Sequence, residues 1–217
     1  MQRVELLKKI EAAGVIGVVR GTSKEQGKKA CKALVAGGMK GLEITFTLPK
    51  ADEVIEELLA ERTDTEVIIG AGTVLDATTA RLAILAGAEF IVSPTFDQAT
   101  AELCNLYQIP YLPGCMTITE MKIALNAGVD IIKLFPGSAF GPSIISAFKA
   151  PLPQLNIMPT GGVNSGNLAD WLNAGAIAIG VGGSLLAPAE REDYQQVTKN
   201  AEEYMKRYRQ FKEQDNE

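Results

Sequence analysis

The sequence contains no histidine. This absence excludes Ser-His-Asp and Cys-His nucleophilic catalysis. It also excludes the histidine-based metal sites that are common in hydrolases and in metal-dependent aldolases. Acid–base chemistry would therefore depend on a carboxylate, a lysine, a tyrosine or water.

Cysteine and positive charge are also scarce. The three cysteines, Cys31, Cys104 and Cys115, have no CxxC spacing, and an odd number of cysteines does not form a closed set of disulfides. This pattern favours a reducing compartment. The formal net charge of -5 gives no basic footprint for nucleic acid. An anionic small molecule is still compatible, because a local site can be positive on an acidic protein.

Long hydrophobic runs are absent as well. No run approaches the roughly 18 apolar residues that a membrane span requires. The first fourteen residues, MQRVELLKKIEAAG, have the pattern of an amphipathic helix and lack the apolar core of a signal peptide. We therefore predict a cytoplasmic protein without membrane contact. The 217 residues show no linker or break in composition, which predicts a single domain spanning residues 1–217.

Eight short runs of β-branched and apolar residues recur along the chain. Their first residues are 19 to 26 positions apart, which leaves room for one crossover helix and is too long for a hairpin. Near-continuous apolar runs are typical of parallel strands that helices cover. The predicted strands are Val15–Val19, Gly41–Phe46, Val67–Gly70, Phe90–Ser93, Ile109–Leu112, Asp130–Phe135, Asn156–Pro159 and Ile177–Val181.

Helix boundaries lie in the intervals between these runs. Ser23 with Gln26, and Thr117 with Glu120, have the spacing of capping boxes. Four intervals end in a glycine that permits a left-handed turn before the next strand. Eight strand–helix units in about 200 residues predict a closed (β/α)8 barrel, a TIM barrel, with an extra N-terminal helix over its base. An open doubly wound sheet is the competing fold.

Two strands carry an ionisable residue among apolar neighbours. Lys133 lies within Asp130–Phe135, where burial disfavours the charged ammonium and would yield the free amine that attacks a ketone. Glu43 lies within the second strand, and Arg20 ends the first. In a barrel, catalytic residues lie at the carboxyl ends of the strands, so these three are the main candidates. The alternative is that Glu43 and Lys133 form a structural ion pair.

Glycine turns follow three of the predicted strands. The turns Gly161-Gly162 and Gly182-Gly183-Ser184 follow the last two strands, where barrels often bind phosphate through backbone N–H groups. The turn that ends in Thr73 offers a hydroxyl and further backbone donors, although it could equally be a tight connection. Pro94 and Phe135 would form apolar walls of the site or fill the core.

Six segments, taken in order, resemble the family of 2-keto-3-deoxy-6-phosphogluconate (KDPG) aldolases. This family also includes 4-hydroxy-2-oxoglutarate and phosphogalactonate aldolases, which are class I, Schiff-base lyases of sugar-acid catabolism. The resemblance covers nearly the whole chain. The matching segments are Val18-Val19-Arg20-Gly21, Leu42-Glu43-Ile44-Thr45, Gly70-Ala71-Gly72-Thr73, Lys133-Leu134-Phe135-Pro136, Pro159-Thr160-Gly161-Gly162-Val163 and Gly182-Gly183-Ser184.

The resemblance implies a role for each matching position. Lys133 would be the Schiff-base nucleophile and Glu43 the residue that transfers protons. Thr73 would contact the pyruvyl carboxylate, with Thr160 also at the substrate. The phosphate would be bound by four residues of the two glycine turns, Gly161, Gly162, Gly183 and Ser184. Members of the family are typically homotrimers.

One position departs from the family pattern. Many phosphogluconate aldolases have an arginine four positions after the catalytic glutamate, and this chain has Thr47 there. Arg20 is a candidate to supply the missing charge. The galactonate relatives also have a proline-containing loop at this point, so the resemblance leaves open which C4 epimer is the substrate and whether 4-hydroxy-2-oxoglutarate is used.

The reaction expected from these residues is cleavage of a phosphorylated keto acid to pyruvate and D-glyceraldehyde 3-phosphate. It requires no metal and no organic cofactor. Two other functions remain open on the residues alone. One is a phosphate-binding barrel isomerase or epimerase that uses Glu43 and Lys133 as acid and base. The other is a non-catalytic barrel that binds a phosphorylated metabolite.

Overall fold

Short parallel strands alternate with helices along the chain, as the spacing of the apolar runs predicts. The computed structural model describes residues 1–215, so the last two residues of the predicted domain lie outside the described residues. The strands are β1 (Val15–Val19), β2 (Gly41–Thr45), β3 (Ile68–Gly72), β4 (Ile91–Val92), β5 (Tyr111–Leu112), β6 (Gly114–Cys115), β7 (Ile132–Leu134), β8 (Ile157–Pro159) and β9 (Ile179–Val181).

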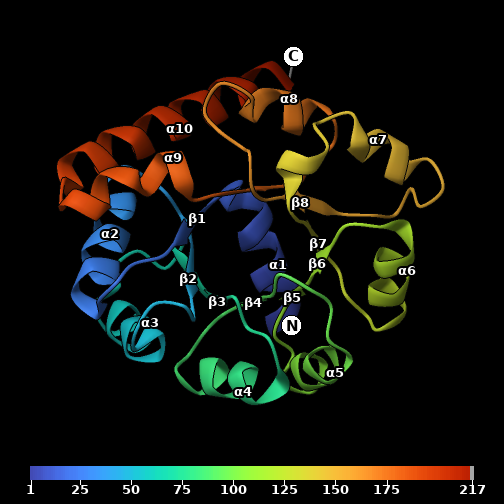
Figure 1. Ribbon diagram of the computed structural model, residues 1–217, viewed down its shortest axis with the longest axis horizontal. Coiled ribbons are helices and arrows are strands. Elements are labelled where there is room, and N and C mark those ends of the chain that lie inside the picture. The colour runs from blue at the N-terminus through green and yellow to red at the C-terminus, as the bar shows by residue number, and fades with distance from the viewer. Residues whose placement is uncertain (216–217) are drawn as a thin grey trace.

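Most helices surround the strands in a ring, whereas α1 (Gln2–Ala13) lies in the middle of that ring in this view (Figure 1). The α-helices are α1 (Gln2–Ala13), α2 (Lys24–Ala36), α3 (Ala51–Glu61), α4 (Ala77–Leu85), α5 (Gln98–Tyr107), α6 (Ile118–Asn126), α7 (Ile144–Lys149), α8 (Leu168–Asn173), α9 (Gly183–Leu186) and α10 (Tyr194–Asp215). Two 3-10 turns, η1 (Gly137–Ala139) and η2 (Ala187–Arg191), follow β7 and α9.

The strands form a curled parallel arrangement. One sheet has the order β5-β4-β3-β2-β1-β9, and a second has the order β6-β7-β8. All pairs within the sheets are parallel. Thr160 and Gly180 form an isolated parallel bridge between the ends of the two sheets. The fold is therefore an α/β fold with a curled parallel sheet, and the carboxyl ends of its strands lie on one side.

The run predicted as Ile109–Leu112 differs from the observed strands. Only Tyr111 and Leu112 form β5, and β6 begins again at Gly114. Pro110 and Pro113 explain the interruption, since proline has no N–H with which to continue a ladder of hydrogen bonds. The carbonyl of Pro113 still accepts a hydrogen bond from Lys133 N at 2.9 Å, so the chain on both sides of Pro113 follows one line beside β7.

The predicted helix ends are observed with one exception. Thr117 and Glu120 form a complete capping box at α6. Ser23 accepts a hydrogen bond from Gln26 N, but the Gln26 side chain does not return to Ser23. It accepts from Thr22 N and donates to the carbonyl of Ala189 instead. The predicted capping box at α2 is thus only half formed, because the Gln26 side-chain oxygen accepts from Thr22 and not from Ser23 N.

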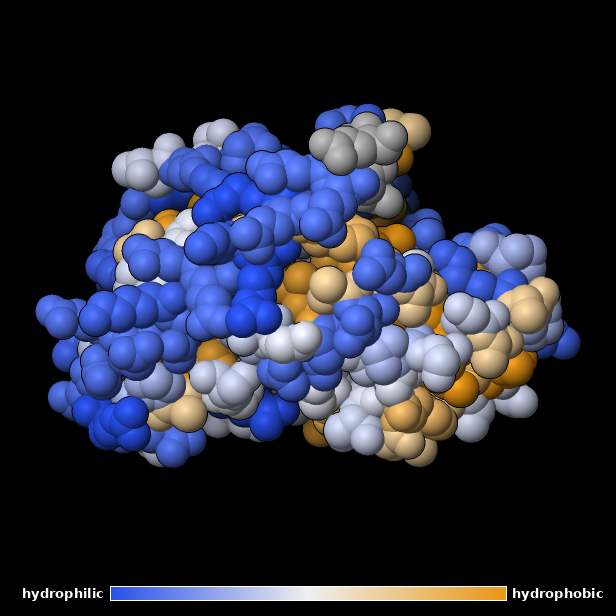
Figure 2. All heavy atoms as spheres, turned by 90° about the horizontal axis from the view of Figure 1, so that it is seen from above, coloured by the Kyte–Doolittle hydropathy of each residue, from blue (hydrophilic) through white to orange (hydrophobic). Residues whose placement is uncertain are grey.

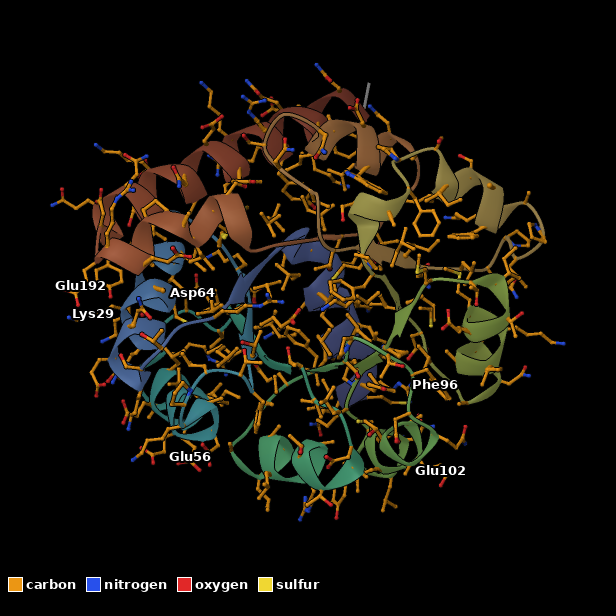
Figure 3. The ribbon with its side chains drawn as sticks, in the orientation of Figure 1. Lys29, Glu56, Asp64, Phe96, Glu102 and Glu192 are labelled. Atoms are coloured by element: carbon orange, nitrogen blue, oxygen red, sulfur yellow. The ribbon has the colours of Figure 1, made fainter. Side chains whose placement is uncertain are left out.

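The core is continuous from the strands to the inner faces of the helices. All five residues of each of the strands β1, β2 and β3 are buried. Helix α1 buries Leu6, Ile10 and Ala13. Figure 3 shows side chains filling the space within the ring of helices, whereas Glu56 and Glu102 lie at its outer edge.

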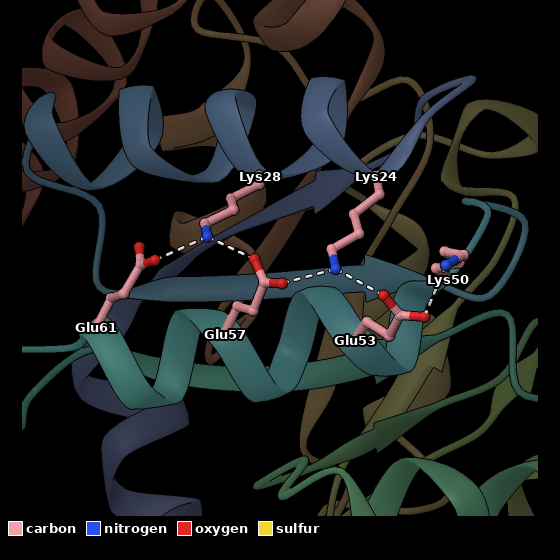
Figure 4. Close-up of polar contacts among 6 residues, drawn as sticks. All are labelled: Lys24, Lys28, Lys50, Glu53, Glu57 and Glu61. Atoms are coloured by element: carbon pink, nitrogen blue, oxygen red, sulfur yellow. Dashed lines mark hydrogen bonds and ion pairs between the residues drawn. The ribbon is translucent and has the colours of Figure 1, made fainter.

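Charged residues line the outer surface. Lys24 and Lys28 of α2 form ion pairs with Glu53, Glu57 and Glu61 of α3, at 2.5 to 2.7 Å (Figure 4). This ion-pair ladder holds the two neighbouring helices together at the surface. The side of the molecule seen from above Figure 1 is mainly hydrophilic, with an apolar area toward its middle (Figure 2). None of the described helices is long and apolar enough to cross a membrane.

Candidate active site

Lys133 and Glu43 meet inside the molecule. Lys133 Nζ donates a hydrogen bond to Glu43 Oε1 at 3.4 Å, and the side chains are only 6% and 1% exposed. Strands β2 and β7 are not neighbours in either sheet, so the two side chains meet across the interior of the curled arrangement. The second carboxylate oxygen, Glu43 Oε2, has no hydrogen-bond partner among the described residues.

Neighbouring strands leave room for this pair by presenting glycine. In the sheet register Glu43 lies opposite Gly70, and Lys133 lies opposite Gly114. A Cβ atom added at Gly72, at the end of β3, would lie 2.1 Å from Glu43 Oε1. An alanine there would displace the carboxylate, so Gly72 keeps the space in which Glu43 reaches toward Lys133.

A cavity of about 730 Å³ opens at the carboxyl ends of β1, β8 and β9. The Phe135 ring connects the cavity to the buried pair, since it lines the cavity and lies 5.2 Å from Lys133 Nζ. The sequence-predicted residues that line the cavity are Arg20, Phe135, Thr160, Gly161 and Gly183. The structure therefore brings together five predicted residues from four different strand ends.

The turn after β8 adopts a conformation that favours glycine. Gly161 and Gly162 have φ of 87° and 76°, in the left-handed region. A Cβ atom at Gly162 would lie 2.8 Å from the Cβ of Ser138. Thr160 is buried, and its hydroxyl oxygen has no partner among the described residues. This turn thus exposes backbone at the cavity and holds an unsatisfied hydroxyl beside it.

Thr47 and Thr73 lie at the strand ends nearest Glu43, and neither lines the cavity. The exposed Thr47 shares a 2.8 Å hydrogen bond with the hydroxyl of Thr45, which contacts the carbonyl of Val19 at 3.0 Å. Thr73 directly follows Gly72 and has φ of 54°. The hydroxyl of Thr47 is thus linked through Thr45 to the backbone at the end of β1.

Pro94 and Ser184 also lie outside the cavity lining. Pro94 follows β4, and its carbonyl oxygen would lie 2.1 Å from a Cβ atom at Gly114, the register partner of Lys133. Pro94 is thus a near neighbour of the β6 backbone beside Lys133. Ser184 is exposed at the start of α9, and its hydroxyl is hydrogen-bonded to Tyr204 of α10 at 2.9 Å.

Three further residues lie at the site, although the sequence did not predict them there. Gln26 and Thr22 line the cavity and connect the segment after β1 to η2. Tyr204 reaches the site from the last helix. The half-formed capping box was the only sequence signal for Gln26. Hydroxyl-bearing and amide residues are common on helices, so their role becomes visible only from the partners that they contact.

The cysteine closest to the pair is not a candidate nucleophile. Cys115 ends β6 and lies opposite Leu134 in the register. Burial, and to a smaller extent the charge of Glu120, raises the pKa of the Cys115 thiol to about 12, so the reactive thiolate is scarce at neutral pH. Within residues 1–215, no group of three His, Cys, Asp or Glu side chains is placed to hold a metal ion.

Fold and site together define a class of protein, an α/β protein whose parallel strands hold a buried lysine–carboxylate pair beside a cavity at their carboxyl ends. The family model for KDPG and KHG aldolases matches residues 6–200. The chain therefore belongs to the KDPG and KHG aldolase family.

Individual relatives align with this chain over nearly their whole length. A 2-dehydro-3-deoxy-phosphogluconate aldolase of Treponema pallidum is 34% identical over 199 residues, which are 90% of this chain and 93% of the relative. A 2-dehydro-3-deoxy-6-phosphogalactonate aldolase of Escherichia coli is 32% identical over 90% of this chain and 94% of its own. A KDPG aldolase of Legionella pneumophila, solved with pyruvate captured as a covalent carbinolamine, has a TM-score of 0.82 at 28% identity, covering 89% of this chain and 95% of the other.

Proposed function

We propose that this protein is a class I aldolase, a lyase that cleaves a phosphorylated 2-keto-3-deoxy sugar acid through a Schiff base on Lys133. The observation that carries the proposal is the buried Lys133–Glu43 pair with one carboxylate oxygen left unpartnered. A purely structural ion pair would be expected to satisfy both oxygens, since an unpaired buried polar atom costs about 1–3 kcal/mol. A free oxygen beside a lysine is the arrangement that a proton-transfer site requires.

The pair supplies the first steps of the reaction. Lys133 gives up a proton to Glu43, 3.4 Å away, and its neutral amine attacks the C2 ketone to form a carbinolamine. Glu43 then returns a proton to the C2 hydroxyl, which leaves as water. The product is a protonated imine between C2 and the lysine nitrogen.

Carbon–carbon cleavage follows from the imine. Glu43, through a water molecule, removes the proton of the C4 hydroxyl, and the electrons of the C3–C4 bond move into the imine. This step releases D-glyceraldehyde 3-phosphate and leaves an enamine. Protonation at C3 and addition of water then release pyruvate and restore the free Lys133 amine. The balance requires no oxidant, metal or organic cofactor.

The cavity and the neighbouring strand ends together supply recognition in this proposal. Gly161, Gly162, Gly183 and Ser184 bind the phosphate, and Arg20 at the cavity wall compensates substrate charge. Phe135 and Pro94 form apolar walls, and Thr47, Thr73 and Thr160 contact the keto-acid part. Phosphate binding far from C2 orients C4 relative to the imine, so that remote binding energy serves the chemical step.

The test is reductive trapping. Incubation with pyruvate and borohydride should attach one reduced pyruvyl group to the peptide that contains Lys133. An isomerase or epimerase that used the pair as acid and base would leave no adduct, and a binding protein would show no turnover. Assays with the C4 epimers of gluconate and galactonate type, and with 4-hydroxy-2-oxoglutarate, then rank the substrates. An adduct on a different lysine would contradict the assignment.

We further infer that the two sheets close into a (β/α)8 barrel in one domain, with α1 across its base. The hydrogen bond from Lys133 N to Pro113 O supports continuity at the first junction, because Pro113 joins β5 to β6, and the one from Ile177 N to Ile157 O supports pairing at the second, between β8 and the segment before β9. The parallel bridge between Thr160 and Gly180 supports closure at the second junction. Strong protection of the Lys133 and Ile177 amides from hydrogen exchange is the expected result, and rapid exchange at either would contradict closure.

A homotrimer in the cytoplasm also belongs to the proposal. Exposed apolar residues gather on the consecutive helices α4, α5 and α6 and the segments beside them, which favours association of copies. The most exposed of these are Leu75, Leu82, Leu85, Leu106 and Ile123. Sedimentation should give three chains for the wild type and a smaller species for Leu85→Glu, and a monomeric wild type would contradict the proposal.

A further inference from the structure

Helix α10 reaches the cavity end of the molecule through one buried hydroxyl. Tyr204 is only 3% exposed, and its Oη lies 2.9 Å from Ser184 Oγ. Ser184 follows Gly183, which lines the cavity. The contact joins the last helix to the turn after β9, and Asn200 on the same helix supports that turn by donating to the carbonyl of Leu185 at 3.2 Å.

The same helix also holds the segment after β8. Arg207, three residues after Tyr204 on this helix, donates to the carbonyl of Ser165 at 2.8 Å. Ser165 lies three residues after Gly162. Helix α10 therefore contacts the turn after β9 and the segment that follows the glycine turn after β8.

The direction of the hydrogen bond follows from the different exposure of the two hydroxyls. Burial raises the pKa of Tyr204, so its hydroxyl keeps its hydrogen at neutral pH. The Tyr204 hydroxyl is buried, and a buried O–H that donates to nothing is costly. The Ser184 oxygen is the acceptor within reach at 2.9 Å. The Tyr204 hydrogen is thus directed at Ser184, which leaves the exposed Ser184 hydroxyl with its own hydrogen to donate.

We propose that Tyr204 is a positioning residue for the phosphate end of the site, orienting Ser184 so that its hydroxyl donates to a phosphate oxygen of the substrate. This inference rests on the proposed function, in which Ser184 binds phosphate. Tyr204 touches no reacting atom. Its effect is on recognition of the phosphorylated substrate and not on the chemistry at Lys133.

The experiment compares Tyr204→Phe with Tyr208→Phe. Tyr208 lies one turn further along α10, is also buried, and packs its ring against Gly14 before β1. For Tyr204→Phe the KM for the phosphorylated keto acid should rise about 3- to 10-fold, the effect of one hydrogen bond. The kcat and the rate of pyruvate trapping by borohydride should stay unchanged, since pyruvate has no phosphate. Tyr208→Phe should leave the KM, the kcat and the rate of pyruvate trapping unchanged.

The double variant shows whether Tyr204 acts through Ser184. Ser184→Ala should raise the KM by itself, and adding Tyr204→Phe to it should give no further increase. An additive increase, or a loss of pyruvate trapping in Tyr204→Phe, would overturn the inference, because either would indicate a general structural effect. So would an unchanged KM in Tyr204→Phe.

The two proposals fail in different ways. If Ser184→Ala raises the KM and Tyr204→Phe does not, Tyr204 is not a positioning residue while the phosphate assignment stands. If Ser184→Ala has no effect, both the phosphate role of Ser184 and the inference are overturned. Pyruvate trapping on Lys133 tests the aldolase assignment separately in every variant.

Discussion

The two ends of the strands have opposite chemical character. At the amino ends, the charged group of Arg3 is fully engaged. Arg3 donates to Asp130 at 2.7 Å and to Asn105 at 2.5 Å, and it also contacts the carbonyl of Gly128. At the carboxyl ends, Glu43 and Thr160 have buried oxygens without a hydrogen-bond partner among residues 1–215, near a cavity of about 730 Å³. The contacts at the amino ends therefore serve stability, whereas the carboxyl ends retain unsatisfied groups that a substrate can meet.

The largest effect is expected from Lys133→Met. Removing the amine removes the nucleophile, so turnover should fall by about 10⁴-fold or more while the fold is retained. Steady-state assays measure the turnover, and thermal unfolding of the same preparation shows whether the fold is retained. Because the variant leaves Glu43 without its partner, Lys133→Met combined with Glu43→Leu should be at least as stable as Lys133→Met alone. Full activity in Lys133→Met, or in its combination with Glu43→Leu, would remove the functional distinction between the amino and carboxyl ends of the strands.

A smaller loss is expected from Glu43→Gln. The substitution keeps the shape of the side chain and removes the base, so carbinolamine dehydration and C3–C4 cleavage should both slow, by roughly 10²- to 10⁴-fold. The measurements are turnover of the phosphorylated substrate and the rate of pyruvate trapping. If both rates match those of the wild type, Glu43 has a structural role only.

Arg3→Met probes the opposite end. The side chain is 15% exposed and loses charge-assisted hydrogen bonds to Asp130 and Asn105. The free energy of unfolding should fall by about 1–3 kcal/mol, with kcat and KM unchanged. Lys8→Met, at an exposed position of the same helix, is the matched control. A decrease in kcat without a decrease in stability would reverse the assignment of the two ends.

The smallest effect concerns the surface ladder between α2 and α3. Hydrogen bonds from Lys24 and Lys28 lower the pKa of Glu57 from the ordinary value of 4.5 to about 2. A lowered pKa means that the contribution to stability is fully present above about pH 4.5 and is lost as the pH falls toward 2.

The corresponding variant is Glu57→Gln. Its midpoint of thermal unfolding should lie slightly below that of the wild type at pH 7, and the difference should vanish near pH 2 and shrink in high salt. Glu56→Gln, on the same helix outside the ladder, is the control. A difference that persists unchanged at pH 2 would indicate that the substitution alters packing and does not act through the ion pairs.

Local patterns predicted much of the fold. The spacing of the apolar runs places all nine observed strands within or next to a predicted run, and β1 spans Val15–Val19 as predicted. Single charged residues inside apolar runs identified Lys133 and Glu43. These predictions succeed because burial of a strand requires apolar neighbours along the chain itself. The short strands β5 and β6 were less well placed, because Pro110 and Pro113 interrupt pairing in this part of the chain.

The order of parallel strand–helix units, the candidate lysine and carboxylate, and the glycines that end the helices can all be predicted from the amino-acid sequence. Long-range packing sets the rest: β2 and β7 face each other across the interior, Gln26 donates to Ala189, and Tyr204 reaches Ser184. The physical reason is the distance along the chain between the residues that set each feature. Apolar periodicity and backbone conformation are set by neighbours in the chain, whereas a polar side chain takes whichever partner packing brings within about 3 Å.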